Sequence, residues 1–109
     1  MPTNPFNQKI YNLLKKVPKG KVTTYRILAE AIGTKAYRAV GQSMKNNPFA
    51  PEVPCHRVVA SDGNIGGFSR EINPNSKEVK KKINMLRKEG VKIRNNRIVE
   101  FKKVLIKKF

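Results

Sequence analysis

The sequence lacks most of the residues from which disulfide, metal and redox sites are built. Its 109 residues include one cysteine, one histidine and no tryptophan. A single cysteine excludes an intramolecular disulfide, and one cysteine with one histidine cannot complete a zinc site. We therefore expect no metal and no cofactor.

Long hydrophobic runs are absent as well. No apolar stretch approaches the roughly 18 residues of a membrane span, and nothing reads as a signal peptide. These absences predict a protein without membrane contact, located in the cytoplasm or, in a eukaryote, in the nucleus. A free thiol is stable in such a reducing compartment.

Acidic residues are scarce. Lys and Arg number 24 against 7 Asp and Glu, which gives a formal net charge of +17. An excess of this size favours a polyanionic partner, of which nucleic acid is the commonest. A lysine-rich solvated surface without such a partner is the alternative that composition leaves open. The length predicts a single domain over residues 1–109, and we expect a monomer.

Apolar spacing predicts a mainly helical protein with small β elements. The expected helices cover residues 5–17, 24–32, 35–46 and 76–89, with Asn4, Thr23 or Thr24, Thr34, and Asn75 or Ser76 as their N-terminal caps. The second and third helices are joined by a tight turn at Gly33, which predicts a helix-turn-helix or winged-helix-like arrangement.

The third predicted helix has an unusual surface. Ala36, Val40 and Met44 form an apolar stripe that is expected to pack on the second helix. The remaining face carries Arg38, Gln42 and Lys45, interleaved with Ala39, Gly41 and Ser43. A glycine inside a helix costs about 1 kcal/mol relative to alanine. Gly41 therefore indicates either tight helix–helix packing or close approach of the helix to a partner such as a narrow minor groove.

Two β-hairpins are predicted after the third helix. The first covers residues 57–68 and turns at Asp62-Gly63, and the second covers 91–101 and turns at Asn95-Asn96, where it can form a wing. The lysine-rich end of the chain, "KKVLIKKF", is expected to be frayed or to form a basic arm.

The stretch "VPCHRVV", residues 53–59, contains the only cysteine and the only histidine. A thiol reacts as the thiolate and needs a base or a cation nearby. Adjacent side chains of an extended strand point to opposite faces, so His56 can reach the Cys55 sulfur only through a bend or a bridging water. A buried cysteine beside an ordinary histidine is the alternative that these residues alone leave open.

A longer pattern surrounds this stretch. "PCHRVV" is preceded by "YRAVGQSMKNNP" and followed by "GNIGGFS", and the chain begins with "PFNQKIYNLLKKVPKGKVTTY". Together these segments resemble the C-terminal active-site domain of the O6-alkylguanine-DNA alkyltransferases, also called methylated-DNA–protein-cysteine methyltransferases. The resemblance covers residues 5–92 and leaves 93–109 as a basic C-terminal extension.

The resemblance implies a single-turnover DNA-repair enzyme. Cys55 takes the alkyl group, chiefly methyl, from O6 of a flipped guanine, His56 is the water-mediated base, and Glu89 orients His56. The family has a separate N-terminal domain, for which these residues contain no counterpart.

The resemblance also implies a substrate pocket and a DNA-binding surface. Tyr25, Val58 through its carbonyl, Phe68 and Ser69 would contact the guanine. Arg38 would fill the gap in double-stranded DNA, with the third helix in the minor groove and Asn47 tying that helix to the active-site loop. Further DNA contacts are expected from Ala39, Gly41, Gln42, Lys45 and Arg57.

Some positions differ from the family pattern. Phe68 stands where tyrosine is usual, Arg70 stands where glycine is expected, and the loop after Ser69 is longer. An alkyltransferase-like protein that binds lesions without chemistry is the nearest competing function, although such proteins typically lack the cysteine. A winged-helix architectural protein is a more distant one.

Overall fold

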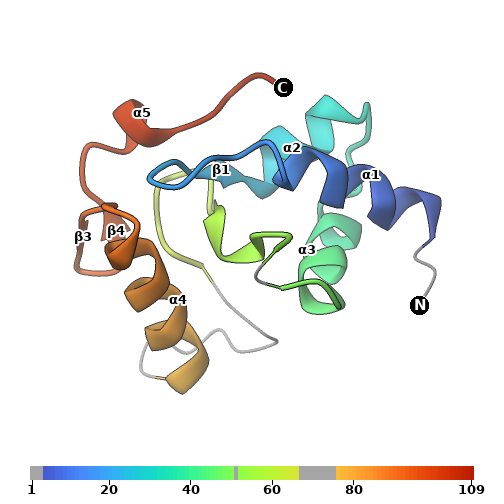
Figure 1. Ribbon diagram of the computed structural model, residues 1–109. Helices are drawn as coiled ribbons and strands as arrows, with labels where there is room; N and C mark the ends of the chain where they lie inside the picture. The colour runs from blue at the N-terminus through green and yellow to red at the C-terminus, as the bar shows by residue number, and fades with distance from the viewer. Residues whose placement is uncertain (1–3, 51, 67–75) are drawn as a thin grey trace.

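The computed structural model describes residues 4–50, 52–66 and 76–109. Its elements in chain order are α1 (Pro5–Leu14), β1 (Thr23–Thr24), α2 (Tyr25–Ala31), α3 (Tyr37–Lys45), the 3-10 turn η1 (Cys55–Arg57), β2 (Val58–Val59), α4 (Lys77–Lys88), β3 (Ile93–Arg94), β4 (Arg97–Ile98) and α5 (Phe101–Val104). Figure 1 shows α1, α2 and α3 gathered on one side, with α4 and the β3–β4 hairpin on the other. The predicted class, mainly helical with small β elements, is confirmed. None of the described helices has the length and apolar character of a membrane span.

Most helices begin where their caps were predicted. The side chains of Asn4, Thr24 and Ser76 each accept a hydrogen bond from the backbone N–H three residues later, at 2.7, 3.0 and 3.2 Å. The prediction for α3 was wrong, because Thr34 accepts from the backbone N–H of Ala36 at 3.0 Å and the helix begins only at Tyr37. The Thr34 hydroxyl satisfies a turn before the helix rather than the helix itself.

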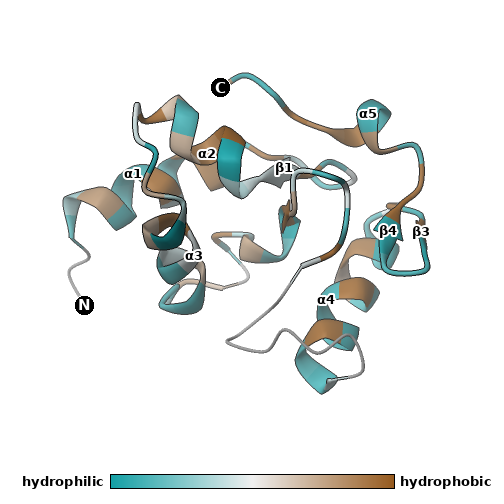
Figure 2. Cartoon of the chain, turned by 180° about the vertical axis from the view of Figure 1, so that it is seen from behind, coloured by the Kyte–Doolittle hydropathy of each residue, from teal (hydrophilic) through white to brown (hydrophobic). Residues whose placement is uncertain are grey.

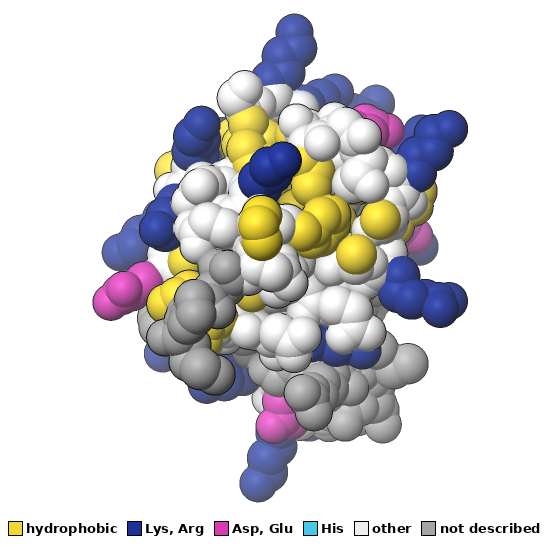
Figure 3. Space-filling model, turned by 90° about the vertical axis from the view of Figure 1, so that its right-hand side faces the viewer, with side chains coloured by type: hydrophobic (Ala, Val, Ile, Leu, Met, Phe, Trp, Pro, Cys, Tyr) yellow, Lys and Arg dark blue, Asp and Glu magenta, His cyan; other side chains and the backbone are white. Residues whose placement is uncertain are grey.

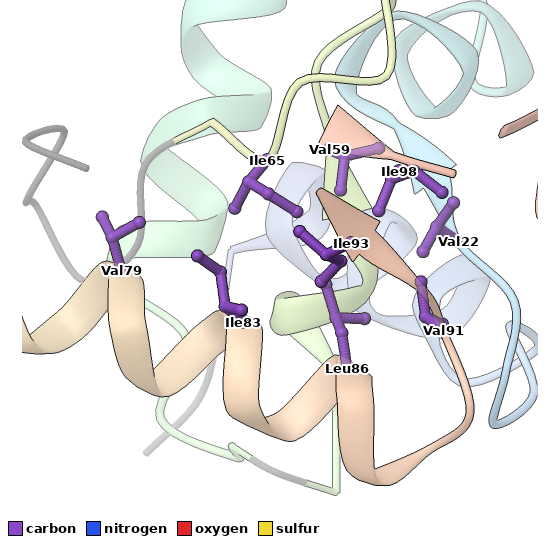
Figure 4. Close-up of a cluster of buried hydrophobic side chains, with 9 residues drawn as sticks. All are labelled: Val22, Val59, Ile65, Val79, Ile83, Leu86, Val91, Ile93 and Ile98. Atoms are coloured by element: carbon purple, nitrogen blue, oxygen red, sulfur yellow. The ribbon is translucent and has the colours of Figure 1, made fainter. Parts of the chain in front are cut away.

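Among the described residues, buried apolar side chains form two clusters on either side of β2. Val58 belongs to the cluster of α1, α2 and α3, whereas Val59 belongs to the cluster of α4 and the β3–β4 hairpin. Successive residues of a strand point to opposite faces, so two valines in sequence serve both clusters. Figure 4 shows the second cluster, in which Val79, Ile83 and Leu86 of α4 face the hairpin. The apolar bands of α4 are visible in Figure 2.

The first predicted hairpin was wrong. Val58 and Val59 do not pair with residues further along the chain but form a parallel pair with Thr23 and Thr24 of β1. The turn at Asp62-Gly63 is present, and the return segment bonds elsewhere, because the Ile65 N–H donates to the Asn96 carbonyl at 2.8 Å. The partner of a two-residue strand far back in the chain leaves no local signal in the sequence.

The second predicted hairpin is confirmed. Ile93 pairs with Ile98 and Arg94 with Arg97 in the antiparallel sense. Asn95 and Asn96 between them have φ angles of 51° and 60°. Positive φ at both central residues is the requirement of a two-residue turn that matches the strand twist, and asparagine tolerates it well.

The end of the chain is docked, contrary to the prediction of a frayed or free basic arm. The Val22 N–H donates to the Val104 carbonyl at 2.9 Å, and the Ile106 N–H donates to the Val22 carbonyl at 2.7 Å. The Thr23 hydroxyl donates to the Ile106 carbonyl at 3.1 Å. Figure 1 shows this segment returning from α5 across the molecule toward α2. It therefore covers the edge of β1 that β2 leaves open.

Deleting residues 105–109 is expected to lower the free energy of unfolding by about 1–3 kcal/mol, because hydrogen bonds to β1 and the partial burial of Leu105 are lost. Chemical denaturation followed by circular dichroism measures this loss. Replacing the exposed Lys107 and Lys108 by alanine is the matched control and should leave the midpoint unchanged. A deletion that unfolds at the same denaturant concentration as the full chain would show that the docked segment contributes nothing.

Candidate active site

Cys55 begins a tight turn rather than a strand. The Cys55 N–H donates to the Val53 carbonyl and the Arg57 N–H to the Pro54 carbonyl, both at 2.9 Å. The Val58 N–H closes the turn by donating to the Cys55 carbonyl. This bend removes the geometric objection to a cysteine and a histidine that are neighbours in sequence. Cys55 is 8% exposed and His56 is 2% exposed.

The Glu89 carboxylate, at the end of α4, binds the turn. His56 Nε2 lies 3.1 Å from Glu89 Oε2. Arg57 donates from Nε to Oε1 at 2.9 Å and from Nη2 to Oε2 at 2.6 Å, a bidentate ion pair with both side chains largely buried. The contact between His56 and Glu89 that the family resemblance implies is therefore present, and Arg57 shares the same carboxylate.

The charges of this cluster are fixed by burial and pairing. Burial alone would raise the pKa of Glu89, but hydrogen bonds from Arg57 and His56 bring it below its ordinary value. Burial lowers the pKa of His56, and this effect outweighs the opposite effect of Glu89. At neutral pH a carboxylate therefore faces a neutral imidazole. His56 Nε2 carries the proton and donates to Glu89, which leaves Nδ1 as a proton acceptor.

Arg57 has an internal role that the sequence did not predict. Its Nη1 donates to the Val17 carbonyl at 2.7 Å, in the segment that follows α1. With its other donors on Glu89, the side chain is 12% exposed. The guanidinium was expected among the DNA contacts, but the structure commits it to joining α1, the turn and α4.

Tyr25 is placed near the turn by the parallel pairing of β1 with β2. Thr24 lies opposite Val59, so Tyr25 leaves β1 beside the point where Ala60 leaves β2. Burial raises the pKa of Tyr25 to about 12, and negative charge on Cys55 adds to this shift. The phenol is therefore protonated at neutral pH and close enough to Cys55 to sense its charge.

A cleft opens in front of Tyr25. It has a volume of about 440 Å³ and is lined by Tyr25, Arg26, Tyr37 and Ser61. A Cβ atom built on Gly66 would lie 3.9 Å from the Tyr25 hydroxyl, and the φ of Gly66 is +74°. The backbone of this loop therefore passes against the tyrosine ring, which is the close approach that the glycines predicted.

The exposed face of α3 is poor in large side chains near its middle. Arg38, Gln42 and Lys45 are exposed, and Ala39 and Gly41 lie between them. No atom lies within 4 Å of a Cβ built on Gly41. Tight helix–helix packing does not account for this glycine, so the open face of α3 remains as its explanation.

The buried face of α3 differs from the predicted stripe. Val40 is buried as predicted, but Ala36 is exposed and Ser43 is buried in its place. The Ser43 hydroxyl donates to Asn7 Oδ1 at 2.5 Å, and its carbonyl accepts from the Tyr11 hydroxyl at 2.8 Å. A polar residue thus joins α3 to α1, which periodicity of apolar residues cannot reveal.

Asn47 connects the end of α3 with the approach to Cys55. Its Nδ2 donates to the Val53 carbonyl at 2.8 Å, and its Oδ1 accepts from the Phe49 N–H at 2.9 Å. The Val53 carbonyl also accepts from the Cys55 N–H. One carbonyl therefore receives both the recognition helix and the cysteine turn.

Lys82 is a site residue that sequence reasoning missed. It is fully buried in α4 and donates from Nζ to the Val58 carbonyl at 2.7 Å. That carbonyl was expected to accept from a guanine amine. Lys82 lies in a helix full of lysines, so no pattern in the sequence distinguishes it. Phe68 and Ser69 lie outside the described residues.

The surface around these elements is strongly basic. Figure 3 shows Lys and Arg side chains projecting around the rim of one face, with few acidic ones among them and hydrophobic side chains toward the centre. Within the part of the chain that the structure describes, no cluster of three or more His, Cys, Asp or Glu side chains could hold a metal ion.

Comparison with known proteins places this arrangement in context. The sequence model of a family described as "6-O-methylguanine DNA methyltransferase, DNA binding domain" matches residues 5–91. The chain is 43% identical over 91 residues to a methylated-DNA–protein-cysteine methyltransferase of Saccharolobus islandicus, which covers 84% of this chain and 54% of that protein. It is 42% identical over 90 residues to a bifunctional methyltransferase/endonuclease of Picrophilus torridus, which covers 82% of this chain and 28% of that protein. The chain thus spans about half the length of the first relative and less of the second.

Solved structures share the fold. The O6-methylguanine-DNA methyltransferase of the archaeon Pyrococcus kodakaraensis superimposes with a TM-score of 0.69 and 46% identity, over 82% of this chain and 48% of that one. S. pombe Atl1, in complex with damaged DNA containing O6-carboxymethylguanine, superimposes with a TM-score of 0.80 and 29% identity, over 98% of this chain and 99% of that one.

Replacing Arg57 by alanine is expected to lower the free energy of unfolding by about 3 kcal/mol, because a largely buried carboxylate loses its bidentate partner. The Val17 carbonyl loses a donor in the same change. Thermal and chemical unfolding measure the effect. Arg26→Ala is the matched control, because that arginine forms an exposed pair with Glu30, and this change should leave stability unaltered. Equal stability of the two variants would refute a structural role for Arg57.

Proposed function

Because this chain belongs to the O6-methylguanine-DNA methyltransferase family, we propose that it repairs DNA by moving the alkyl group of an O6-alkylguanine onto Cys55. The observation that carries the proposal is a buried thiol in the same turn as a histidine that is bonded to a carboxylate. This set lies within residues 5–91, the part that the family's sequence model covers. We therefore also assign this stretch to the active-site domain, the C-terminal one in the resemblance.

The reaction is an in-line displacement at the alkyl carbon. The Cys55 sulfur forms a bond to that carbon, the bond from the carbon to O6 breaks, and guanine leaves with the electron pair. His56 takes the thiol proton on Nδ1, directly or through a water. The protonated Tyr25 phenol donates a hydrogen bond to the departing purine, which then takes a proton from solvent. The resulting thioether is not hydrolysed, so each molecule reacts once.

The burial of Cys55 requires the guanine to leave the duplex. A residue that is 8% exposed cannot reach O6 of a base that stays stacked, and enzymes that act on such bases extrude them into a pocket. The cleft beside Tyr25 is the entrance that fits this demand. Arg38, exposed on α3, fills the gap that the extruded base leaves.

The partner is double-stranded DNA, with α3 in the minor groove. Support comes from the open face of α3, where Ala39 and Gly41 allow the backbone close to the groove floor. Gln42 and Lys45 on the same face are placed for contacts with the DNA backbone. The net charge of +17 supplies attraction without sequence preference, which suits a protein that searches all sequences for a lesion.

Lesion binding without transfer is the second candidate function. The likeness to S. pombe Atl1 favours it, because that match extends over 98% of this chain, further than the matches to the methyltransferases. Cys55 with its His56–Glu89 pair favours transfer, since a protein that only binds a lesion needs none of these groups. The experiment that follows separates the two functions.

Incubation with a duplex that carries one O6-methylguanine is expected to add one methyl group to the peptide that contains Cys55. Mass spectrometry of the digested protein detects the added mass, and the amount should stop at one equivalent. Cys55→Ser is the matched control and should gain no methyl group.

The other outcomes separate the alternatives. Tight binding of the damaged duplex without methylation of Cys55 would replace the proposal with the lesion binder. Equal affinity for damaged and undamaged duplexes, again without methylation, would indicate an architectural DNA-binding protein.

A further inference from the structure

Lys82 is a buried cation beside the cysteine turn. Its exposed fraction is 0%, although lysine is almost never fully buried without a partner. It lies seven residues before Glu89, two helical turns earlier on the same face of α4. The same helix face thus presents an acidic and a basic group to the segment around Cys55.

Lys82 fixes two backbone segments at the site. Its Nζ donates to the Val58 carbonyl and to the Ile65 carbonyl, both at 2.7 Å. Val58 closes the cysteine turn through its N–H, and Ile65 precedes the glycine that lies against Tyr25. One ammonium group therefore sets the position of the turn relative to the wall of the cleft.

The charges around the thiol differ in their state at neutral pH. The described titratable groups that interact with Cys55 are Tyr11 of α1, Tyr25 of α2 and Lys82 of α4, with His56 next to it in the turn. Burial raises the pKa of both tyrosines and lowers that of His56. These three groups are therefore neutral, and Arg57 is balanced by Glu89.

The lysine and the thiol influence each other. Burial lowers the pKa of Lys82 to about 7, and negative charge on Cys55 opposes this shift. The amine and the thiol then compete for a proton near neutral pH, because a free thiol titrates only slightly higher. A shared proton on nitrogen leaves a thiolate on sulfur, and the thiolate is the nucleophilic form.

We propose that Lys82 is a positioning residue of the transfer reaction, which holds the carbonyls of Val58 and Ile65 in place and stabilises the Cys55 thiolate with its buried charge. The inference rests on the proposed function for the target of that thiolate. The coupling between the two side chains is a property of the protein alone and is tested without DNA.

The test is the rate at which iodoacetamide alkylates Cys55 as a function of pH. Cys55 is the only cysteine in the chain, so the reaction reports a single site. In Lys82→Gln and Lys82→Met the midpoint should rise by about one pH unit, with a rate at pH 7 that falls about tenfold. Lys81→Gln, an exposed position on the same helix, is the matched control and should follow the unchanged protein.

A purely structural role predicts a different outcome. Loss of backbone support alone changes the rate at every pH but leaves the midpoint where it was. An unchanged midpoint in folded Lys82 variants therefore overturns the proposal. Circular dichroism of each variant establishes that it is folded before the rates are compared.

A second measurement needs no variant. The Lys82 ammonium is titrated by nitrogen-detected NMR in the unmodified protein and after Cys55 is capped as a neutral mixed disulfide with methyl methanethiosulfonate. Coupling of two sites is reciprocal, so capping should lower the Lys82 midpoint by about one unit. An identical midpoint in both forms refutes the coupling.

These outcomes are separable from the proposed function. A protein that shows the shifted midpoints but leaves O6-methylguanine duplexes unrepaired retains the coupling and loses the proposed activity. A protein that repairs the duplex with no shift in any midpoint retains the activity and loses the role of Lys82.

Discussion

Hydrogen bonds from His56 and Arg57 converge on the Glu89 carboxylate, and the rest of the site is arranged around this point. Arg57 continues to the Val17 carbonyl, so the segment after α1, the cysteine turn and the end of α4 meet there. The loop before β1 also approaches closely, because a Cβ on Gly20 would lie 3.2 Å from the Glu89 carbonyl and the φ of Gly20 is +84°. The carboxylate is thus a structural anchor and, through His56, part of the chemistry.

The parallel pair of β1 with β2 performs a second task with very few residues. It divides the described apolar interior, since Val58 and Val59 point into different clusters. It also leads directly into α2 at one strand and follows the cysteine turn at the other, which brings Tyr25 and Cys55 within electrostatic reach. Helices on one side carry the surface offered to DNA, and α4 on the other supports the nucleophile. The site lies at the boundary between them.

Local signals in the sequence predicted most of the helices and missed most of the long-range pairing. Caps at Asn4, Thr24 and Ser76 and the turn at Asn95-Asn96 depend on neighbours within a few residues, and all are present. The partner of β2, the docking of Ile106 on Val22 and the burial of Lys82 depend on residues distant in the chain. The contact of His56 with Glu89 came from the family resemblance, because no spacing rule connects positions so far apart. Arg57 was misplaced for a related reason, since an arginine beside a cysteine suggests DNA until its buried carboxylate partner is known.

The most direct test of the account is the structure of Cys55→Ser bound to a duplex that contains one O6-methylguanine. Serine preserves the turn and prevents transfer, so the substrate stays in place. The account predicts the modified guanine outside the base stack, with its O6 substituent facing residue 55, Tyr25 against the purine, Arg38 in the vacated space and α3 in the minor groove. A modified guanine that remains stacked in the duplex, or an α3 that lies away from the minor groove, would contradict the site described for Cys55, His56 and Glu89.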